Sequence, residues 1–212
     1  MKRLLVTGVS GLLGSNLARL AAGRFQITGV LTGEHAIVSP GQASFITIMA
    51  DLTCPGQVER IIDQTQPEVI IHCAAMTNVD RCEAYPEQAE RINTNLPALI
   101  AKIAARNGVP LLHISTDAVF DGELGSYCEE DQPKPVNVYA RTKFEGEQCV
   151  AEAYPEALIA RVNFYGWSWQ GHRSLAEWFY NNLSAGKTIP GFTDLIFCPL
   201  LVNDLIDILF KM

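Results

Sequence analysis

Two side chains that could cooperate in proton transfer lie four residues apart in the stretch VYARTKFEGE. Tyr139 and Lys143 share one face of a helix predicted over residues 138–152, since residues four apart are neighbours on a helix surface. A free tyrosine has a pKa of about 10, too high for ready proton exchange at neutral pH, and a nearby ammonium group favours the phenolate. The pair is therefore a candidate acid–base centre, although the same spacing is common on solvated helices.

A hydroxyl group that could assist this pair stands upstream, in the stretch HISTDAVFDG. An apolar strand ends there in Ser115 and Thr116. Open α/β sheets bind ligands at the carboxyl ends of their strands, so a hydroxyl at this point could hydrogen-bond a substrate carbonyl while the tyrosine delivers the proton. We expect Thr116 to do this, and we expect Asp117 and Asp121 to form the following turn through side-chain-to-backbone bonds.

A glycine-rich turn in VTGVSGLLG predicts a dinucleotide site. Gly8, Gly11 and Gly14 follow a predicted first strand and open a predicted first helix. Glycine lets the chain turn tightly and approach a pyrophosphate closely, and the start of a helix offers free N–H groups to the anion. Close packing without a nucleotide is the less favoured explanation. The glycine turn, the hydroxyl and the Tyr/Lys pair occur in this order along the chain, and that order is the specific signal.

The end of the second predicted strand bears on the choice between NAD and NADP. A carboxylate there would hold the ribose 2′-hydroxyl of NAD, whereas an arginine would accommodate the 2′-phosphate of NADP. The sequence reads GVLTGEH, so Glu34, which is followed by His35, comes two residues late and no arginine is present. Both coenzymes remain open, with NADP marginally favoured.

The elements that must position these groups alternate between strand-like and helical runs. Strands are predicted at 3–8, 26–31, 45–49, 69–73, 110–115 and 157–162, and helices at 12–22, 56–64, 87–106 and 138–152. Strands such as PEVIIHCAA and VPLLHIS are apolar on both faces, which is typical of parallel strands covered by helices on both sides. The alternation predicts a doubly wound parallel α/β sheet. We expect a kink or restart at Pro97 and an irregular link between residues 31 and 45.

The alternation fades after Gly166, which predicts two unequal parts. Residues 1–165 would form an NAD(P)-binding Rossmann domain, and residues 166–212 a small, shortened substrate lobe over the carboxyl edge of the sheet. The aromatic residues of NFYGWSWQGH, which include Trp167 and Trp169, could stack on a base or sugar. We rank packing of the lobe against the main domain first.

Composition excludes several other kinds of site. The formal charge of −7 comes from scattered acidic residues, so no basic surface for nucleic acid or an anionic membrane is predicted. The six cysteines form no C-x-x-C pair and the four histidines are equally dispersed, so we expect neither disulfides nor a metal site. No stretch approaches the roughly 20 apolar residues of a membrane span, and glycines interrupt the apolar start. We therefore expect a cytoplasmic protein.

Several stretches together resemble the extended short-chain dehydrogenase/reductases. They are TGVSGLLG, DLT, PEVIIHCAAMTNVDRCE, INTNLPALIAKIA, ISTDAVFDG and VYARTKFEGE. Within that superfamily the chain most resembles the dTDP-4-dehydrorhamnose reductases and the regulatory β subunits of methionine adenosyltransferase. The resemblance covers about residues 1–166 well. It implies hydride transfer from a reduced nicotinamide to the ketone carbon of a keto-sugar nucleotide, with Tyr139 protonating the oxygen.

The resemblance also implies roles for individual residues. The catalytic residues would be Thr116, Tyr139 and Lys143, and Lys143 would also bind the nicotinamide ribose and lower the pKa of the tyrosine. Residues implied to contact the coenzyme are Gly8, Gly11, Leu12, Leu13, Gly14, Asp51, Leu52, Ala74, Ala75, Asn93, Tyr139 and Lys143. The glycine turn would hold the pyrophosphate, Asp51 with Leu52 would lie near the adenine, and the two alanines would pass beside the nicotinamide ribose.

One of these assignments carries an alternative. Asn93 would support the site, or would instead satisfy a helix kink before Pro97, and these explanations weigh equally. The stretch FCPLLVNDLIDIL resembles the family's segment in which a strand leads into a helix on the lid lobe.

One residue separates possible reactions. Ala118 stands where the reductases usually carry an aromatic residue, and where the related dehydratases carry the glutamate of Thr-Asp-Glu, so dehydration ranks low. The first hypothesis is an NAD(P)H-dependent sugar-nucleotide reductase. The alternatives are another sugar-nucleotide epimerase or dehydrogenase and a catalytically idle, coenzyme-binding regulatory subunit. The expected partner is a nucleotide sugar, and a homodimer is possible.

Overall fold

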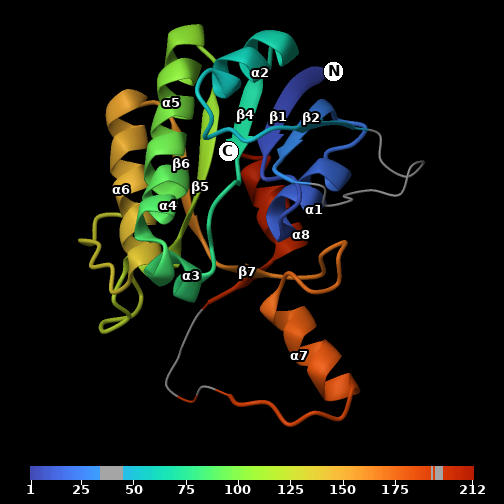
Figure 1. The fold of residues 1–212 in the computed structure, drawn as a ribbon, viewed down its shortest axis with the longest axis vertical. Coiled ribbons are helices and arrows are strands. Elements are labelled where there is room, and N and C mark those ends of the chain that lie inside the picture. Colours follow the sequence, from blue (N-terminus) through green and yellow to red (C-terminus); the bar gives the residue numbers. More distant parts are fainter. Residues whose placement is uncertain (34–44, 192, 194–197) are drawn as a thin grey trace.

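The centre of the protein is a six-stranded parallel sheet with strand order β3-β2-β1-β4-β5-β6 (Figure 1). The computed structural model describes residues 1–33, 45–191, 193 and 198–212. The strands are β1 Lys2–Thr7, β2 Phe25–Leu31, β3 Ile46–Met49, β4 Val69–His72, β5 Leu111–Thr116 and β6 Leu158–Val162. The doubly wound parallel sheet predicted from the alternation is confirmed. The strand order reverses between β1 and β4, and ligands of such sheets bind at the carboxyl ends beside a reversal of this kind.

The helices follow the predicted alternation, with additions. They are α1 Leu12–Leu20, α2 Gln57–Thr65, α3 Val79–Ala84, α4 Pro86–Glu90, α5 Leu96–Asn107, α6 Val138–Ala153, α7 Leu175–Ser184 and α8 Val202–Leu209. The stretch predicted as one helix over 87–106 is interrupted by a π-helical turn at Arg91–Asn95, and Pro97 lies in the first turn of α5. The predicted restart is thus confirmed, since proline is tolerated where the N–H has no helical partner. The short helix α3 was not predicted.

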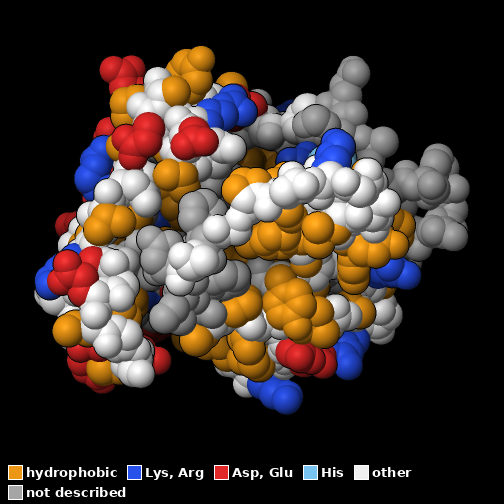
Figure 2. All heavy atoms as spheres, turned by 90° about the horizontal axis from the view of Figure 1, so that it is seen from below, with side chains coloured by type: hydrophobic (Ala, Val, Ile, Leu, Met, Phe, Trp, Pro, Cys, Tyr) orange, Lys and Arg blue, Asp and Glu red, His pale blue; other side chains and the backbone are white. Residues whose placement is uncertain are grey.

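The tail after β6 leaves the sheet and returns to it. The short strands β7 Phe164–Tyr165 and β8 Leu200–Leu201 pair in parallel. Helix α7, which lies between these two strands in the sequence, projects away from the main sheet (Figure 1). The side chains of Ser174 and Glu177 form a capping box that starts α7. Figure 2 shows apolar side chains gathered on the face seen from below. Among the described residues, α7 exposes Leu175, Trp178, Phe179, Tyr180 and Leu183.

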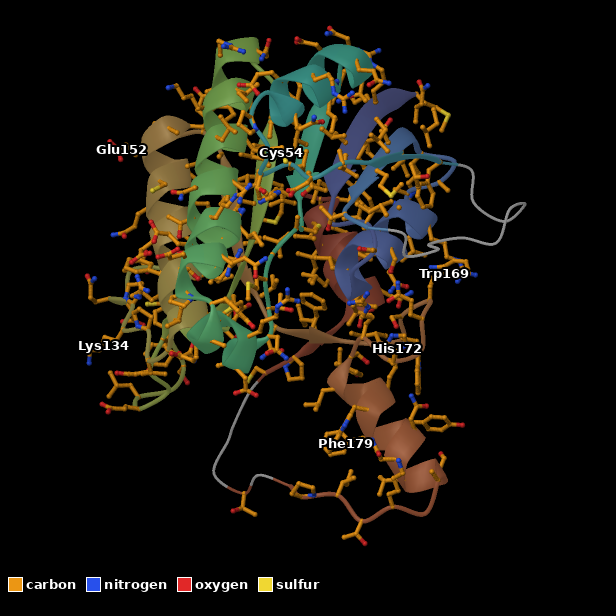
Figure 3. All side chains as sticks on the ribbon, viewed as in Figure 1. Cys54, Lys134, Glu152, Trp169, His172 and Phe179 are labelled. Atoms are coloured by element: carbon orange, nitrogen blue, oxygen red, sulfur yellow. The ribbon has the colours of Figure 1, made fainter. Side chains whose placement is uncertain are left out.

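The aromatic residues before α7 pack against the main domain and against α7. The Arg19 guanidinium of α1 lies 4.8 Å from the ring centre of Trp169, whose position beside α1 is seen in Figure 3. The Asn16 side chain donates a hydrogen bond of 3.0 Å to the Trp167 carbonyl, and the Trp167 ring meets Tyr180 edge-on. The explanation ranked first, packing against the main domain, is therefore confirmed for Trp169, whereas the Trp167 ring packs on α7 and only its carbonyl contacts the main domain.

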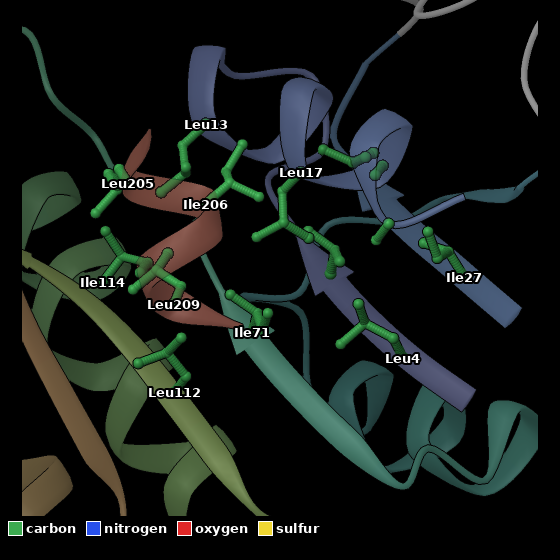
Figure 4. Close-up of a cluster of buried hydrophobic side chains, with 14 of the residues drawn as sticks. Leu4, Leu13, Leu17, Ile27, Ile71, Leu112, Ile114, Leu205, Ile206 and Leu209 are labelled. Carbon is green, nitrogen blue, oxygen red and sulfur yellow. The ribbon is translucent and has the colours of Figure 1, made fainter. Parts of the chain in front are cut away.

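Alternate residues of the strands fill two separate cores. One core lies under α1 and α8 and contains residues such as Leu4, Ile71 and Leu112 (Figure 4). The other lies under α2, α5 and the end of α6, and contains residues such as Leu5 and Ile70. Both faces of the central strands are apolar because both are covered. Towards the carboxyl ends, the second face changes from apolar to polar side chains, and this change positions the site.

The helix α8 lies in the first core rather than on a lid. Its inward residues Val202, Leu205, Ile206 and Leu209 follow a helical period and are buried against Leu13 and Leu17 of α1 (Figure 4). The prediction that a strand leads into a helix is confirmed, but its placement on the lid lobe is wrong. The physical reason is that the α1 side of the sheet needs a second helix to cover β4 and β5. The division of the chain after residue 165 stays a prediction.

Candidate active site

The predicted site residues gather at the carboxyl edge of the sheet, beside the reversal of strand order. The glycine turn follows β1, Cys73 to Ala75 follow β4, and Thr116 ends β5. The first turn of α6 brings Tyr139 to the same edge, and Asn137 starts this helix by accepting a hydrogen bond of 2.8 Å from the Ala140 N–H. Four segments that are distant in sequence therefore meet at one place.

The glycine turn is packed too tightly for side chains. Gly8 has a φ of +68°, and a Cβ there would lie 2.7 Å from the Cα and N of Ala74. A Cβ on Gly14 would lie 2.5 Å from the Gly8 carbonyl oxygen. Gly11 is the N-cap of α1 and has no side chain to cap it, so the first-turn N–H groups have no partner from that residue. Such a helix start favours an anion through its N–H groups and its dipole.

The candidate acid–base residues come together. Thr116 is buried, and its hydroxyl accepts a hydrogen bond of 3.1 Å from the Ala118 N–H and lies 3.3 Å from an Asp117 carboxylate oxygen. Burial raises the pKa of Tyr139, a hydrogen bond with Thr116 lowers it, and the Asp117 carboxylate raises it. The phenol therefore stays protonated well above neutral pH. The expectation that Lys143 lowers the pKa of Tyr139 is not met, because Lys143 is not among the described groups that shift this pKa and burial gives the net rise.

The Lys143 ammonium is buried under the end of β5. Its Nζ donates a hydrogen bond of 2.7 Å to the Ile114 carbonyl and lies 3.4 Å from Nε2 of His113. Burial lowers the pKa of Lys143 to about 8, and the nearby Glu147 and Cys73 oppose this effect. The lysine is thus fixed in the site by a backbone carbonyl of the strand that ends in Thr116.

Stability should rise with pH because of Lys143. The lysine has a pKa of about 8 when folded and 10.5 as its ordinary value, so between these values the unfolded chain binds more protons. Relative to a Lys143→Met variant, the free energy of unfolding of the natural protein should therefore rise by on the order of 2 kcal/mol from pH 7.5 to pH 9.5, measured by urea denaturation. Lys102→Met, a change on the exposed side of α5, should leave the rise intact. Parallel curves for the natural protein and Lys143→Met would contradict this.

Asn93 supports the site from behind. It lies in the π-helical turn, it is buried, and its Oδ1 accepts a hydrogen bond of 2.8 Å from the Met76 N–H. Its Nδ2 donates to the Met76 carbonyl at 3.0 Å and to the Thr142 hydroxyl at 3.2 Å, so both N–H groups are used within the protein. Asn93 therefore ties the segment after β4 to α6, beside Lys143. The geometry favours this supporting role over a direct coenzyme contact.

The residues expected near the adenine and the ribose differ in their exposure and in their hydrogen bonds. Asp51 is exposed after β3, and hydrogen bonds from the Thr53 hydroxyl and N–H lower the pKa of its carboxyl. Leu52 is buried in the second core and has little surface for a ligand. The Ala74 N–H donates a hydrogen bond of 3.3 Å to the Thr7 hydroxyl. Glu34 and His35, on which the choice of coenzyme depended, lie outside the described residues.

The turn after Thr116 is formed by Asp121 as expected, but the side-chain-to-backbone bond expected of Asp117 is wrong among the described residues, because the Thr116 hydroxyl accepts the Ala118 N–H in its place. An Asp121 carboxylate oxygen accepts hydrogen bonds from the Glu123 N–H at 3.1 Å and from the Tyr127 hydroxyl. The other oxygen pairs with the Lys134 ammonium at 3.4 Å. Asp117 binds the Asn163 side chain at 3.0 Å, which links the end of β5 to the segment after β6. Sequence reasoning missed Asn163, whose only signal is its place directly after a strand.

A buried polar layer under α6 was also missed. His72 and His113 are dispersed in the sequence, but strand register makes them neighbours on β4 and β5. Farther along the same face, Glu147 accepts hydrogen bonds from the Ser115 hydroxyl and, at 2.8 Å, from the Arg161 guanidinium. The available signal was a polar residue inside each apolar strand, as in VIIH and LLHIS.

Among the described residues, no cluster of three or more metal-ligating side chains occurs, and no helix is long and apolar enough to cross a membrane.

Comparisons with known proteins agree with the fold and the motifs. The family described as the RmlD substrate binding domain matches residues 1–212. A probable low-salt glycan biosynthesis reductase of Haloferax volcanii is 36% identical over 205 residues, which cover 92% of this chain and 65% of the relative. The methionine adenosyltransferase 2 subunit beta of Bos taurus is 37% identical over 164 residues, which cover 76% of this chain and 46% of the relative.

A solved structure provides the corresponding comparison in three dimensions. The dTDP-4-dehydrorhamnose reductase of Bacillus anthracis, in complex with NADP, superposes with a TM-score of 0.82 at 28% identity. The match covers all of this chain and 70% of that one. The chain thus spans about half to two thirds of the length of these curated relatives.

Proposed function

Because the chain belongs to the RmlD substrate binding domain family, we propose that it carries the coenzyme-binding and acid–base part of an NAD(P)H-dependent reductase of keto-sugar nucleotides. The observation that carries this proposal is the meeting of Thr116, Tyr139 and Lys143 at the carboxyl edge of the sheet, beside an uncapped helix start. The reductase names among its relatives support the same reaction class. The substrate class is a sugar nucleotide with a ketone, of the dTDP-4-dehydrorhamnose type.

The residues present fit a nicotinamide dinucleotide. Gly8, Gly11 and Gly14 have no Cβ to obstruct a pyrophosphate, and the free N–H groups at the start of α1 would bind its charge. Ala74 and Ala75 would lie along the nicotinamide ribose, and Lys143 would bind its hydroxyls. When bound, the reduced coenzyme would supply the hydride. Residues 1–165 would hold the coenzyme, and part of 166–212 would lie toward the sugar nucleotide.

The chain's own residues would supply alignment and the proton. Tyr139 is held protonated by burial and by the Asp117 carboxylate, so it starts as a donor to the oxygen of the ketone. Its O–H bond breaks as the O–H bond of the product alcohol forms, and the Thr116 hydroxyl would stabilise the phenolate left behind. Ala118 stands where the related dehydratases carry the glutamate of Thr-Asp-Glu, so the site lacks that residue as a base for elimination of water from the sugar.

The activity is tested by following NADPH oxidation with dTDP-4-dehydrorhamnose as the substrate. Oxidation that depends on the sugar nucleotide and yields the corresponding alcohol would support the proposal. Binding of coenzyme without turnover on any keto-sugar nucleotide would contradict it.

NADPH should stabilise the protein more than NADH does. The NADP-bound relative of similar fold supports this preference, and a tenfold difference in affinity corresponds to about 1.4 kcal/mol of added stability. The measurement is the thermal unfolding midpoint at equal concentrations of each coenzyme. Equal shifts, or a larger shift with NADH, would overturn the preference.

A second candidate is a coenzyme-binding regulatory subunit without catalysis. The similarity to a methionine adenosyltransferase beta subunit favours it, as does Ala118, which replaces the aromatic residue usual in the reductases. This candidate predicts coenzyme binding, no turnover, and a stable complex with a separate enzyme whose activity changes on binding.

A further inference from the structure

A row of buried polar side chains crosses three strands and ends at Lys143. Register places Thr7 of β1 beside His72 of β4, and His72 beside His113 of β5. Both imidazoles are 1% exposed, and their rings stack with centres 5.3 Å apart and planes 20° apart. The row occupies the sheet face covered by α2, α5 and α6, where the other residues toward the start of the strands are apolar.

The contact with Lys143 fixes the proton position of His113. Nδ1 of His72 lies 2.6 Å from the Thr7 hydroxyl, and Nε2 of His113 lies 3.4 Å from Nζ of Lys143. An ammonium group can only donate, so Nε2 of His113 must be the acceptor and its proton must sit on Nδ1. Two nitrogen atoms, Nδ1 of His113 and Nε2 of His72, are buried and have no hydrogen-bond partner among the described residues. Each buried polar atom without a hydrogen-bond partner lowers the stability of the fold by about 1–3 kcal/mol, so the row is unfavourable for stability.

The charged surroundings leave His113 as the side-chain acceptor nearest the ammonium. Glu147, one turn along α6, is engaged by the Ser115 hydroxyl and by two guanidinium nitrogens of Arg161. Burial raises the pKa of the Cys73 thiol to about 12, so it stays neutral. Burial, with Lys143 nearby, lowers the pKa of His72 to about 3 and that of His113 well below its ordinary value. Both imidazoles are therefore neutral near pH 7.

We propose that His113 is a positioning residue for Lys143: its neutral imidazole accepts a hydrogen bond from the ammonium and holds it at the end of β5, and His72 fixes the imidazole by stacking. The Ile114 carbonyl supplies the second acceptor at 2.7 Å, which leaves the third N–H of the ammonium for a ligand. The catalytic meaning of this contact rests on the proposed function, but the contact itself does not.

The test is a direct titration of Lys143 by NMR in protein labelled at the lysine side chains. The Lys143 signal is assigned by its loss in Lys143→Arg. In His113→Gln, the side-chain oxygen can replace Nε2 as an acceptor, whereas in His113→Asn it is too short to reach. We expect the pKa of Lys143 to fall by about one pH unit in His113→Asn and to stay within about 0.3 in His113→Gln, because an acceptor favours the charged form.

A matched histidine elsewhere controls for the substitution itself. His172→Asn changes an exposed histidine of the segment before α7 and should leave the Lys143 titration unchanged. Equal pKa values for Lys143 in the natural protein, His113→Asn and His113→Gln would overturn the proposal. Since the Asn and Gln variants are both polar and similar in size, a loss of folding common to both, with Lys143 unchanged in the folded fraction, would also overturn it.

The two proposals fail separately. If no keto-sugar nucleotide is reduced but the titration of Lys143 shifts as expected, the proposed function is wrong and the positioning role stands. If reduction occurs, His113→Asn should lower kcat more than it raises KM, and the pH dependence of kcat should move in the same direction as the NMR titration.

Discussion

Replacing Tyr139 by phenylalanine should lower kcat for reduction of the keto-sugar nucleotide by a factor of about 10²–10⁴, the usual contribution of a general acid. The change removes one oxygen from a side chain whose pKa is raised by burial, so the site loses its proton donor while its shape is kept. Coenzyme binding should change little, because the glycine turn and Lys143 are untouched. Coenzyme fluorescence titration and steady-state kinetics separate the two effects.

The control for this variant is Tyr85→Phe, which removes the same atom from an exposed tyrosine at the end of α3. Tyr85→Phe should match the natural protein in kcat and in coenzyme affinity. If Tyr139→Phe also matched it, Tyr139 could not be the proton donor, and the reductase proposal would lose its central residue.

Gly146→Ala should destabilise the protein by about 2–3 kcal/mol, although alanine usually stabilises a helix interior by about 1 kcal/mol over glycine. Gly146 lies inside α6 where this helix meets the π-helical turn, and a Cβ there would lie 2.2 Å from the Asn93 carbonyl oxygen. The obstacle is backbone of an adjacent helix, so relief requires α6 to move away from the turn. The free energy of unfolding from urea denaturation measures the effect.

Gly191→Ala is the control, because a Cβ at Gly191 has no neighbour within 4 Å among the described residues. It should change the free energy of unfolding by less than about 0.5 kcal/mol. An unchanged or increased stability for Gly146→Ala would mean that the contact between α6 and the turn is looser than the structure shows. The same displacement would move Thr142 and Lys143, so coenzyme affinity should fall along with stability.

The sequence was sufficient for features that depend on local chemistry. The β-α alternation predicts a parallel sheet, and parallel strands bring their carboxyl ends to one edge, so the glycine turn, Thr116 and Tyr139 were expected to meet. Pro97 predicted the restart of a helix, because proline has no N–H to donate to the preceding turn and its ring clashes with the carbonyl there. The sequence did not show that the interruption is a π-helical turn, or that this turn carries Asn93.

Features that depend on tertiary contacts were not predictable. The period of VNDLIDIL shows that α8 buries one face, but not which surface covers it, and the lid placement was wrong for this reason. The pairing of His72 with His113 depends on how β4 and β5 are aligned, and the residue pattern within a single strand does not determine that register. Spacing alone suggested a lowered pKa for Tyr139, whereas the cost of burying a charged phenolate, visible only in three dimensions, is larger.

The position of α8 has a consequence for how the chain acquires its fold. Residues 202–209 complete the core around Leu13 and Leu17, so contacts between residues far apart in the sequence close one side of the sheet. Contacts of such long sequence separation form slowly, because the loop between them must lose its freedom first. During synthesis on the ribosome, the first β-α units would wait with an open apolar face until α8 emerges. An exposed apolar face of this kind favours aggregation, so the β1–α1 region is most exposed to it before residues 202–209 have been made.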